Sequence, residues 1–411
     1  MIERGVEPFL TPATPPVVVL EGPRMSGKTV VAQRLVAAGR LAGYENLADP
    51  MTRQIATADT AGWLASLPSS VAIDEAQLIE DLPLYVKFLV DQPGSSRHFL
   101  LTGSAALGRS GLGGSDPLTG RVTRCQLRPF TAFELNGRPQ RMAALVDELF
   151  SGAITATSVY QSIDVPALIA AGGFAPIALT GADTVTADRW VRDTVIGLLT
   201  DRVLPDDRFD TGIGLRVLDG CLRDPCGVLN LTALGQRLSI DSRTVDRYLD
   251  VMERRFLLHF SPNLAQNPAR QTRARSKVYP VDTAFAAESL RRADPARVNQ
   301  PSMMGHLFEA WVVNQIVPCL GLGPTGVNLH HWRTPRGDAV VDVVLADTAG
   351  RVVGIEVKSS SVVTIREAKG LRAMAATHNM VAGYVIYLGN KVVRLAERCW
   401  ALPAAALVAG P

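Results

Sequence analysis

The sequence has 411 residues, which is more than one ordinary hydrophobic core supports, so two to four domains are expected. A hydrophobic content of 47% with 20% charged residues excludes a disordered or fibrous chain and indicates a globular one. The formal net charge of +3 neither requires nor excludes nucleic acid as a partner. A site for a polyanion would therefore have to come from a local cluster of basic residues.

Cysteine usage and hydropathy predict a cytoplasmic protein without a membrane partner. The five cysteines form no CxxC pair and no metal-ligand spacing, as expected of reduced core residues. The N-terminal segment lacks the basic-then-apolar order of a signal peptide. No apolar run reaches the roughly 18–20 residues that span a bilayer.

The first part of the chain alternates short β-branched runs with helical stretches, which is typical of a parallel α/β sheet. The predicted strands are Val17–Leu20, Val71–Ile73 and Phe99–Leu101, and a helix is predicted over Leu82–Val90. A loop of small residues from Gly108 to Gly120 is predicted to be mobile.

Helices dominate the middle of the chain, and strands return near its end. Residues 140–225 and 227–260 indicate helices, and one more helix is expected over residues 300–317. Two strands then follow, Val340–Leu345 and Arg351–Lys358. A tight turn at Gly350 separates them.

Residues 22–29 match the phosphate-binding pattern G-x4-G-K-[ST] at every fixed position, and they are Gly22, Pro23, Arg24, Met25, Ser26, Gly27, Lys28 and Thr29. A predicted strand precedes this loop and a helical pattern over Val30–Ala38 follows it, as the motif requires. We expect the loop amides to bind the phosphates of ATP, with Lys28 at the β- and γ-phosphates and the Thr29 hydroxyl on Mg²⁺. A glycine-rich turn that matches by chance is the alternative.

The segment VAIDEAQ at residues 71–77 supplies the second half of the predicted nucleotide site. Asp74 is expected to bind Mg²⁺ through water, and Glu75 is expected to polarise the attacking water. Acidic strand ends are common, so the signal depends on the P-loop that precedes it.

The third predicted strand ends in hydroxyl groups. Thr102 or Ser104 is a candidate to sense the γ-phosphate from between Asp74 and Glu75, and a cap for the next helix is the alternative. Arg121 is a candidate to stabilise charge at its own nucleotide, or at that of a neighbouring copy in a homo-oligomer. A surface salt bridge is the alternative for Arg121. The predicted catalytic residues are thus Lys28, Glu75 and Arg121.

Residues 231–258 predict a helix-turn-helix. The first helix runs to about Leu238, and Asp241 or Ser242 caps the second, whose buried stripe is Val245, Leu249 and Met252.

Basic residues in and after this segment are candidates for DNA contact, namely Arg243, Arg247, Arg270, Arg273, Arg275 and Lys277. Against this, Asp246, Asp250 and Glu253 share the second helix and would repel a phosphate backbone. Packing between domains therefore stays open as the alternative.

The two C-terminal strands carry a possible second site. A carboxylate at Asp342, inside an apolar strand, needs a partner or a metal. Glu356 and Lys358 share one face of the returning strand. Asp followed by Glu-x-Lys across a hairpin is the arrangement of the PD-(D/E)XK nuclease fold, in which carboxylates hold a divalent metal, and Glu309 matches an additional acidic ligand. The alternative is a Glu–Lys pair on a sheet face, with Asp342 bonded to backbone.

Taken together, these motifs resemble a family of bacterial and archaeal ATP-binding proteins. The matching segments are GPRMSGKT, AIDEAQ, LLTGSA, the stretch at 120–135, GGFAP at 172–176, residues 231–258, SKVYPVDTAF, GHLFEAWV, WRT at 332–334 and GIEVKSS. The resemblance implies an N-terminal AAA-type ATPase domain and a C-terminal domain of unknown function with a restriction-endonuclease-like end. Many members of this family carry Glu at the position of Val340, so the departure here weakens the case for metal binding.

The expected fold class is therefore α/β, with four domains. They are an AAA-type P-loop ATPase domain with a parallel sheet (1–140), a helical linker domain (141–225), a winged-helix-like domain (226–295) and a PD-(D/E)XK nuclease-like domain (296–411).

The leading hypothesis for function is an ATPase that uses Mg²⁺ and the state of its nucleotide to switch the C-terminal module, with DNA as a candidate partner. An ATP-gated, metal-dependent DNA nuclease is one alternative. A non-catalytic regulatory or scaffold protein that binds ATP is the other.

Overall fold

The structure is a computed structural model that describes residues 2–11, 15–104, 116–156, 159–200, 209–264, 275–323, 326–334 and 336–409. The chain divides into two compact units. The smaller holds Val6–Arg128, and the larger holds the first five residues, Pro129–Thr200 and Arg208–Pro411. In the predicted mobile loop, residues 108–115 lie outside the described residues, and residues 117–120 form turns.

The smaller unit is built on a parallel sheet with the strand order β2-β3-β4-β1-β5. Its strands are β1 (Val17–Glu21), β2 (Gly43–Asn46), β3 (Ser70–Asp74), β4 (His98–Gly103) and β5 (Val122–Gln126). The three predicted strands are present and extend by one to three residues. Their continuous apolar sequences reflect burial on both faces, which parallel sheets require.

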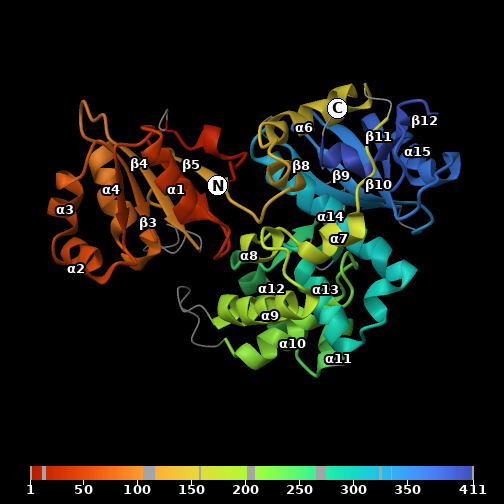
Figure 1. The fold of residues 1–411 in the computed structure, drawn as a ribbon, viewed down its shortest axis with the longest axis horizontal. Coiled ribbons are helices and arrows are strands. Elements are labelled where there is room, and N and C mark those ends of the chain that lie inside the picture. The colour runs from red at the N-terminus through yellow and green to blue at the C-terminus, as the bar shows by residue number, and fades with distance from the viewer. Residues whose placement is uncertain are drawn as a thin grey trace. The chain divides into compact units, whose positions relative to one another are not determined.

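Helices cover this sheet, and they are α1 (Lys28–Ala37), α2 (Pro50–Ala58), α3 (Thr60–Ser66) and α4 (Leu82–Val90). Val17, Ile73 and Leu101 belong to a core that includes side chains of α3 and α4. Helix α1 packs against β3 and β4 (Figure 1). Because all five strands are parallel, their carboxyl ends meet at one edge, and the loops that follow β1, β3 and β4 gather there.

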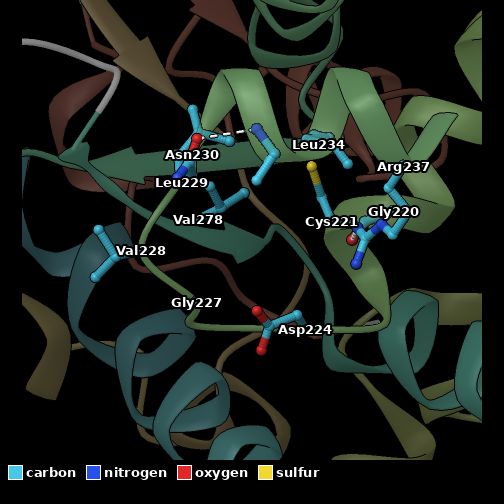
Figure 2. Close-up of a pocket in the computed structure, with 11 residues that line it drawn as sticks. Gly220, Cys221, Asp224, Gly227, Val228, Leu229, Asn230, Leu234, Arg237 and Val278 are labelled. Atoms are coloured by element: carbon cyan, nitrogen blue, oxygen red, sulfur yellow. Dashed lines mark hydrogen bonds between the residues drawn. The ribbon is translucent and has the colours of Figure 1, made fainter. Parts of the chain in front are cut away.

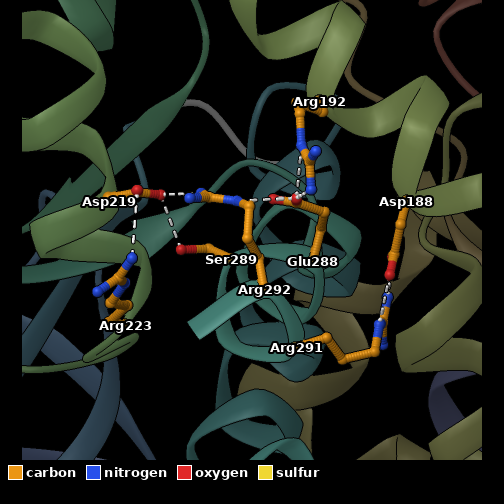
Figure 3. A network of polar contacts seen from close by, with 8 residues as sticks. All are labelled: Asp188, Arg192, Asp219, Arg223, Glu288, Ser289, Arg291 and Arg292. Atoms are coloured by element: carbon orange, nitrogen blue, oxygen red, sulfur yellow. Dashed lines mark hydrogen bonds and ion pairs between the residues drawn. The ribbon is translucent and has the colours of Figure 1, made fainter. Parts of the chain in front are cut away.

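The larger unit begins with a helical part. Its helices are α5 (Ala132–Leu135), α6 (Arg141–Ser151), α7 (Val165–Ala171), α8 (Ala175–Ala178), α9 (Thr184–Thr200), α10 (Thr211–Leu222), α13 (Thr283–Ala293) and α14 (Pro301–Leu320). Figure 3 shows an ionic network that joins α9, α10 and α13. In it, Glu288 accepts from Arg192 at 2.9 Å and from Arg292 at 3.0 Å, and Asp219 accepts from the buried Ser289 hydroxyl at 2.8 Å.

A compact substructure follows α10 in the chain. It comprises α11 (Leu231–Leu238), α12 (Ser242–Arg254) and the antiparallel pair β6 (Leu258–Ser261) and β7 (Lys277–Pro280). The two predicted helices are present: Asp241 caps α12, and Val245, Leu249 and Met252 are fully buried. A short segment before α11 forms an isolated β-bridge with β7, in which Leu229 donates to the Ser276 carbonyl and Val278 donates to the Gly227 carbonyl.

The C-terminal part is a mixed sheet with the order β12-β13-β11-β10-β9-β8. The strands are β8 (Asn328–Arg333), β9 (Val340–Ala346), β10 (Arg351–Lys358), β11 (Asn379–Tyr387), β12 (Val393–Ala396) and β13 (Cys399–Pro403). β9 and β10 form the predicted hairpin, and helix α15 (Lys369–Ala375) links β10 to the parallel strand β11. α15 packs on the sheet through Leu371 and Met374, and α6 and α14 also contact β10 (Figure 1).

All five cysteines are reduced and buried, as the sequence predicts. Across the described residues, none of the helices combines the length and apolar character needed to cross a membrane.

Candidate functional site

The P-loop connects β1 to α1 at the carboxyl edge of the smaller unit's sheet. Gly22 must be glycine, because a Cβ there would lie 2.1 Å from the carbonyl oxygen of Leu127. Gly27 has φ +95°, in the region that favours glycine, and caps α1. No side chain caps the first turn of α1, so its N–H groups remain available to an anion.

Lys28 is buried and lies over the loop. Its ammonium donates to the carbonyl oxygens of Gly22 at 2.9 Å and Pro23 at 2.8 Å. Ser26 is also buried, whereas Arg24 and Met25 are exposed. The sequence-predicted loop is therefore a closed turn in which a lysine, backbone amides and a hydroxyl converge.

Asp74 ends β3 beside this loop. The Thr29 hydroxyl donates to Oδ2 of Asp74 at 2.6 Å, and the Tyr44 hydroxyl donates to the same oxygen at 2.9 Å. The Thr102 hydroxyl and the amide of Glu75 donate to Oδ1. Within the described ranges no lysine or arginine pairs with this carboxylate, so neutral donors alone surround its charge.

Glu75 follows with φ +55°, a left-handed conformation that costs a non-glycine residue of order 1 kcal/mol. Gln77 donates to Glu75 and approaches the Ser104 hydroxyl at 3.4 Å. The structure thus brings both candidate sensors to the acid pair but separates them. Thr102 contacts Asp74, and Ser104 lies on the side of Glu75.

Two residues of this site were missed in the sequence. Tyr44 lies on β2, whose sequence Gly-Tyr-Glu-Asn has no apolar run and gave no strand signal. Burial, and then the negative charge of Asp74, raise the pKa of the Tyr44 hydroxyl, so it stays a donor. Gln77 follows Glu75 by two residues, and only the contact with Ser104 gives it a role.

Arg121 lies at the opposite edge of the sheet from the P-loop. It precedes β5, its carbonyl accepts from Val17 at the start of β1, and its side chain pairs with Asp91 at 2.5 Å. Five residues of strand, about 16 Å, separate Arg121 from the loop, so the structure does not bring it to the P-loop of its own chain. The surface salt bridge is observed.

A second group of charged side chains lies in the larger unit, and its members are Lys277, Tyr279, Glu309, Asp342, Glu356 and Lys358. The Lys277 ammonium is 2.7 Å from Oε1 of Glu309 and 3.0 Å from Oδ1 of Asp342. The Tyr279 hydroxyl donates to the same Glu309 oxygen at 2.7 Å. We call these six residues the acid cluster.

The acid cluster extends along β10. Oδ2 of Asp342 accepts from the amide of Val357 at 3.1 Å and lies 4.0 Å from the Lys358 ammonium. Lys358 donates to Oε2 of Glu356 at 2.9 Å. Asp342 therefore contacts both backbone and an ammonium group, so elements of both sequence-based alternatives are present.

Burial sets the ionisation of the acid cluster. It raises the pKa of Glu309 to about 7 and that of Glu356 to about 8, and the charge of Asp342 adds to both shifts. Burial lowers the pKa of Lys277, but the charges of Glu309 and Asp342 outweigh it and raise the value above that of an ordinary lysine. Lys277 is therefore a permanent cation.

Two sequence predictions concern this cluster, and the observed contacts do not support either of them. Lys277 was expected to contact DNA, but its side chain is only 7% exposed and points to carboxylates. Glu309, Asp342 and Glu356 were expected to hold a metal, but in the described part of the chain no three His, Cys, Asp or Glu side chains are grouped as a metal site. An ammonium group lies between Glu309 and Asp342 instead. Tyr279 was missed, since nothing marks it in the sequence.

The other candidates for DNA contact are only partly described. Arg243 and Arg275 are exposed, and Arg247 is half-buried on α12. Arg270 and Arg273 lie outside the described residues.

A separate pocket of about 250 Å³ opens between the end of α10, the segment at 227–229 and α11 (Figure 2). Asp224, Asn230 and Arg237 line it, and Arg237 donates to the Gly220 carbonyl at 3.0 Å. None of the predicted site residues lines this pocket.

Comparison with known families divides the chain into three matches. Residues 14–136 match an AAA domain. Residues 163–296 and 304–407 match two domains of unknown function, DUF8612 and DUF4143. The P-loop unit is an AAA domain. A restriction-endonuclease-like end is not among these matches.

Relatives and solved structures resemble the chain at low identity. Uncharacterized protein Rv2008c of Mycobacterium tuberculosis and uncharacterized protein Mb2031c of Mycobacterium bovis are each 25% identical over 405 residues, which cover 95% of this chain and 80% of theirs. The RuvB Holliday junction branch migration motor of Thermotoga maritima is 21% identical, over 63% of this chain and 83% of its own, with a TM-score of 0.28. The Orc1 protein of Aeropyrum pernix, solved in complex with DNA, is 14% identical over 72% and 91%, with a TM-score of 0.26. Similarity at these TM-scores is too low to indicate a shared function.

Proposed function

We propose that the protein binds ATP at the P-loop of its AAA domain and hydrolyses it with Mg²⁺. The observation that carries the proposal is the 2.6 Å hydrogen bond between Thr29 and Asp74. It joins the first turn of α1 to the end of β3, so a hydroxyl and a carboxylate lie together beside the phosphate-binding loop.

The residues present fit a magnesium–nucleotide complex. Oxygen ligands suit Mg²⁺, and Thr29 and Asp74 supply them next to amides that point from an uncapped helix start. When bound, Mg²⁺ would neutralise charge on the phosphate oxygens. Lys28 would exchange its two loop carbonyls for phosphate oxygens, which are stronger acceptors for an ammonium group.

Glu75 is assigned the role of orienting the attacking water. The left-handed backbone of Glu75 and its hydrogen bond to Gln77 orient the Glu75 carboxylate. It lies next to Asp74 but is not one of the groups that donate to Asp74. Ser104 and Gln77 together would report the presence of the γ-phosphate to Glu75. Thr102, which is fully buried, would hold Asp74 in place.

The test measures ATP binding and phosphate release for three proteins, namely the wild type, Lys28→Ala and Glu75→Gln. We expect Lys28→Ala to lose nucleotide binding, because it removes the ammonium group of the loop. We expect Glu75→Gln to bind ATP but to release phosphate on the order of 10²- to 10⁴-fold more slowly. Normal turnover in both variants contradicts the proposal, and bound ATP without phosphate release in the wild type favours a non-catalytic role.

We further propose that the nucleotide switches a DNA-binding element in the larger unit. In chain order, α10, the bridge segment at Val228, α11, α12, β6 and β7 follow the order of a winged helix. Arg243 is exposed in the first turn of α12. Arg243 and Arg247 are one turn apart, so both can reach phosphates on one side of a duplex.

DNA binding is tested with duplex DNA at several salt concentrations, with and without ATP. We expect Arg243→Ala/Arg247→Ala to weaken binding and to lower the salt slope by about 2. Arg394→Ala, an exposed arginine on β12, is the matched control. Equal binding by the double variant and the control contradicts the assignment of α12, and binding that ignores ATP contradicts the switch.

A further inference from the structure

The position of Lys277 within the acid cluster carries an inference beyond ATP hydrolysis. Its ammonium group contacts one oxygen of Glu309 at 2.7 Å and one oxygen of Asp342 at 3.0 Å. These two oxygens come from α14 and β9, and no other ammonium or guanidinium group of the described chain lies between them. A single positive charge thus bridges two carboxylates.

A divalent ion and this ammonium group exclude each other. Magnesium and manganese ions bind carboxylate oxygens at about 2.0–2.3 Å, so an ion shared by Glu309 and Asp342 would overlap the Lys277 nitrogen. Like charges at that separation would also repel strongly in a buried site. The residues present therefore do not fit a metal ion while Lys277 keeps its position.

The strand that carries Lys277 is held on both sides. β7 pairs with β6, where Lys277 lies opposite Ser261, and an isolated β-bridge joins Lys277 to Val228 on the other side. Tyr279, two residues along β7, binds the same Glu309 oxygen. The ammonium group is thus fixed by the backbone register of β7.

Two other carboxylate oxygens of the cluster already accept hydrogen bonds, although Lys358 itself is partly exposed. Oδ2 of Asp342 accepts from the backbone amide of Val357, and Oε2 of Glu356 accepts from Lys358. Gly370 at the start of α15 covers the other oxygen of Glu356, since a Cβ there would lie 2.5 Å from it.

We infer that Lys277 is a built-in cation that takes the place of a divalent metal ion in the acid cluster, so that the cluster ties β7 to the C-terminal sheet and becomes a metal site only when position 277 loses its charge.

The experiment measures Mn²⁺ binding to the nucleotide-free full chain by the loss of the free-ion signal in electron paramagnetic resonance. All proteins carry Asp74→Asn, which removes the carboxylate of the AAA domain from the measurement. In this background we expect no Mn²⁺ binding that depends on Asp342. We expect Lys277→Met to gain about one Mn²⁺ site per chain, with at least a ~10-fold increase in affinity, because carboxylate ligands suit Mn²⁺.

Two further variants identify the site. Lys358→Met is the matched control, since it removes an ammonium from the same cluster without vacating the place between Glu309 and Asp342, and it should gain no Mn²⁺ site. Adding Asp342→Asn to Lys277→Met should abolish the gained site. A folded Lys277→Met protein that binds no Mn²⁺ overturns the inference.

The inference can also be tested if Lys277→Met does not fold without added Mn²⁺. In that case the inference requires that Mn²⁺ restores its folding, and failure of Mn²⁺ to do so counts against it. The unchanged cluster gives an independent test. If it binds Mn²⁺ in the Asp74→Asn protein and loses that binding with Asp342→Asn, then the lysine yields to metal and the inference is wrong.

Discussion

Asp74 in the AAA domain and Asp342 in the acid cluster are both largely buried, and each lies near a second acid and a lysine. Their hydrogen-bond partners differ. Asp74 accepts from three hydroxyl groups and one amide, while Lys28 points to loop carbonyls. Asp342 accepts from the Lys277 ammonium and the Val357 amide. Neutral donors hold a carboxylate in place but leave its charge for an external cation, whereas an internal ammonium group neutralises it.

The same comparison explains why similar residue types predict different chemistry. In the AAA domain, lysine and acids come from segments whose spacing is set by a loop and a parallel sheet. In the acid cluster, the decisive lysine comes from β7, 65 residues before Asp342. We therefore expect external cations to act at the first site and not at the second.

The largest effect is expected from Asp74→Asn. The substitution removes the charge that would attract Mg²⁺, and we expect Mg²⁺-dependent phosphate release to fall by about 100-fold or more. Nucleotide binding measured without Mg²⁺ should change little. Unchanged phosphate release would mean that Asp74 does not bind the metal, and it would contradict the contrast between Asp74 and Asp342.

The next effect is a loss of stability in Lys277→Met. Removing one partner of a buried ion pair leaves uncompensated charge, so we expect the free energy of unfolding to fall by roughly 3–5 kcal/mol in denaturant titrations. Adding Glu309→Gln should recover part of this loss. Lys391→Met, on the surface, is the control, and an equal loss there would mean that Lys277 has no special role.

The acid cluster also predicts a pH dependence. The pKa of Glu356 is raised to about 8 in the folded chain, so the folded state binds more protons than the unfolded state above the ordinary glutamate value. Stability should therefore fall as pH rises toward 8, then level off with respect to this group. The difference in unfolding free energy between the wild type and Glu356→Gln, followed from pH 5 to 9, isolates it. If the difference in unfolding free energy between the two proteins does not vary with pH, the pKa of Glu356 is not raised.

A smaller effect is expected from Tyr44→Phe. It removes one of the four donors to Asp74, and we expect a loss of about 1 kcal/mol in the unfolding free energy of the AAA domain. Phosphate release should fall less than in Asp74→Asn. A fall as large as in Asp74→Asn would indicate that Tyr44 contacts the nucleotide or its water.

The smallest effect is expected from Arg121→Ala at protein concentrations where the chain is monomeric. Arg121 lies at the far edge of the sheet and pairs with Asp91 at the surface, so phosphate release should not change. A loss of turnover that appears only at high protein concentration would assign Arg121 to a neighbouring copy.

Much of the fold follows from local sequence. The strands around the P-loop, the helix at Leu82–Val90, the cap at Asp241 and the hairpin of β9 and β10 are each encoded by a short apolar period or a turn residue. The P-loop itself was readable because its geometry is set by glycines and a lysine within eight residues. Such features are local, so neighbouring side chains determine them.

The partners of the charged groups were decided by tertiary structure alone. Lys277 looks like one more cation in a basic run, and only the pairing of β7 with its neighbours turns it toward Glu309 and Asp342. The order of the strands in the sheet likewise determines which groups Tyr44 and Arg121 contact. The partner of a charged side chain is the opposite charge that the fold brings within about 4 Å of it, and the spacing of residues in the sequence does not reveal that distance.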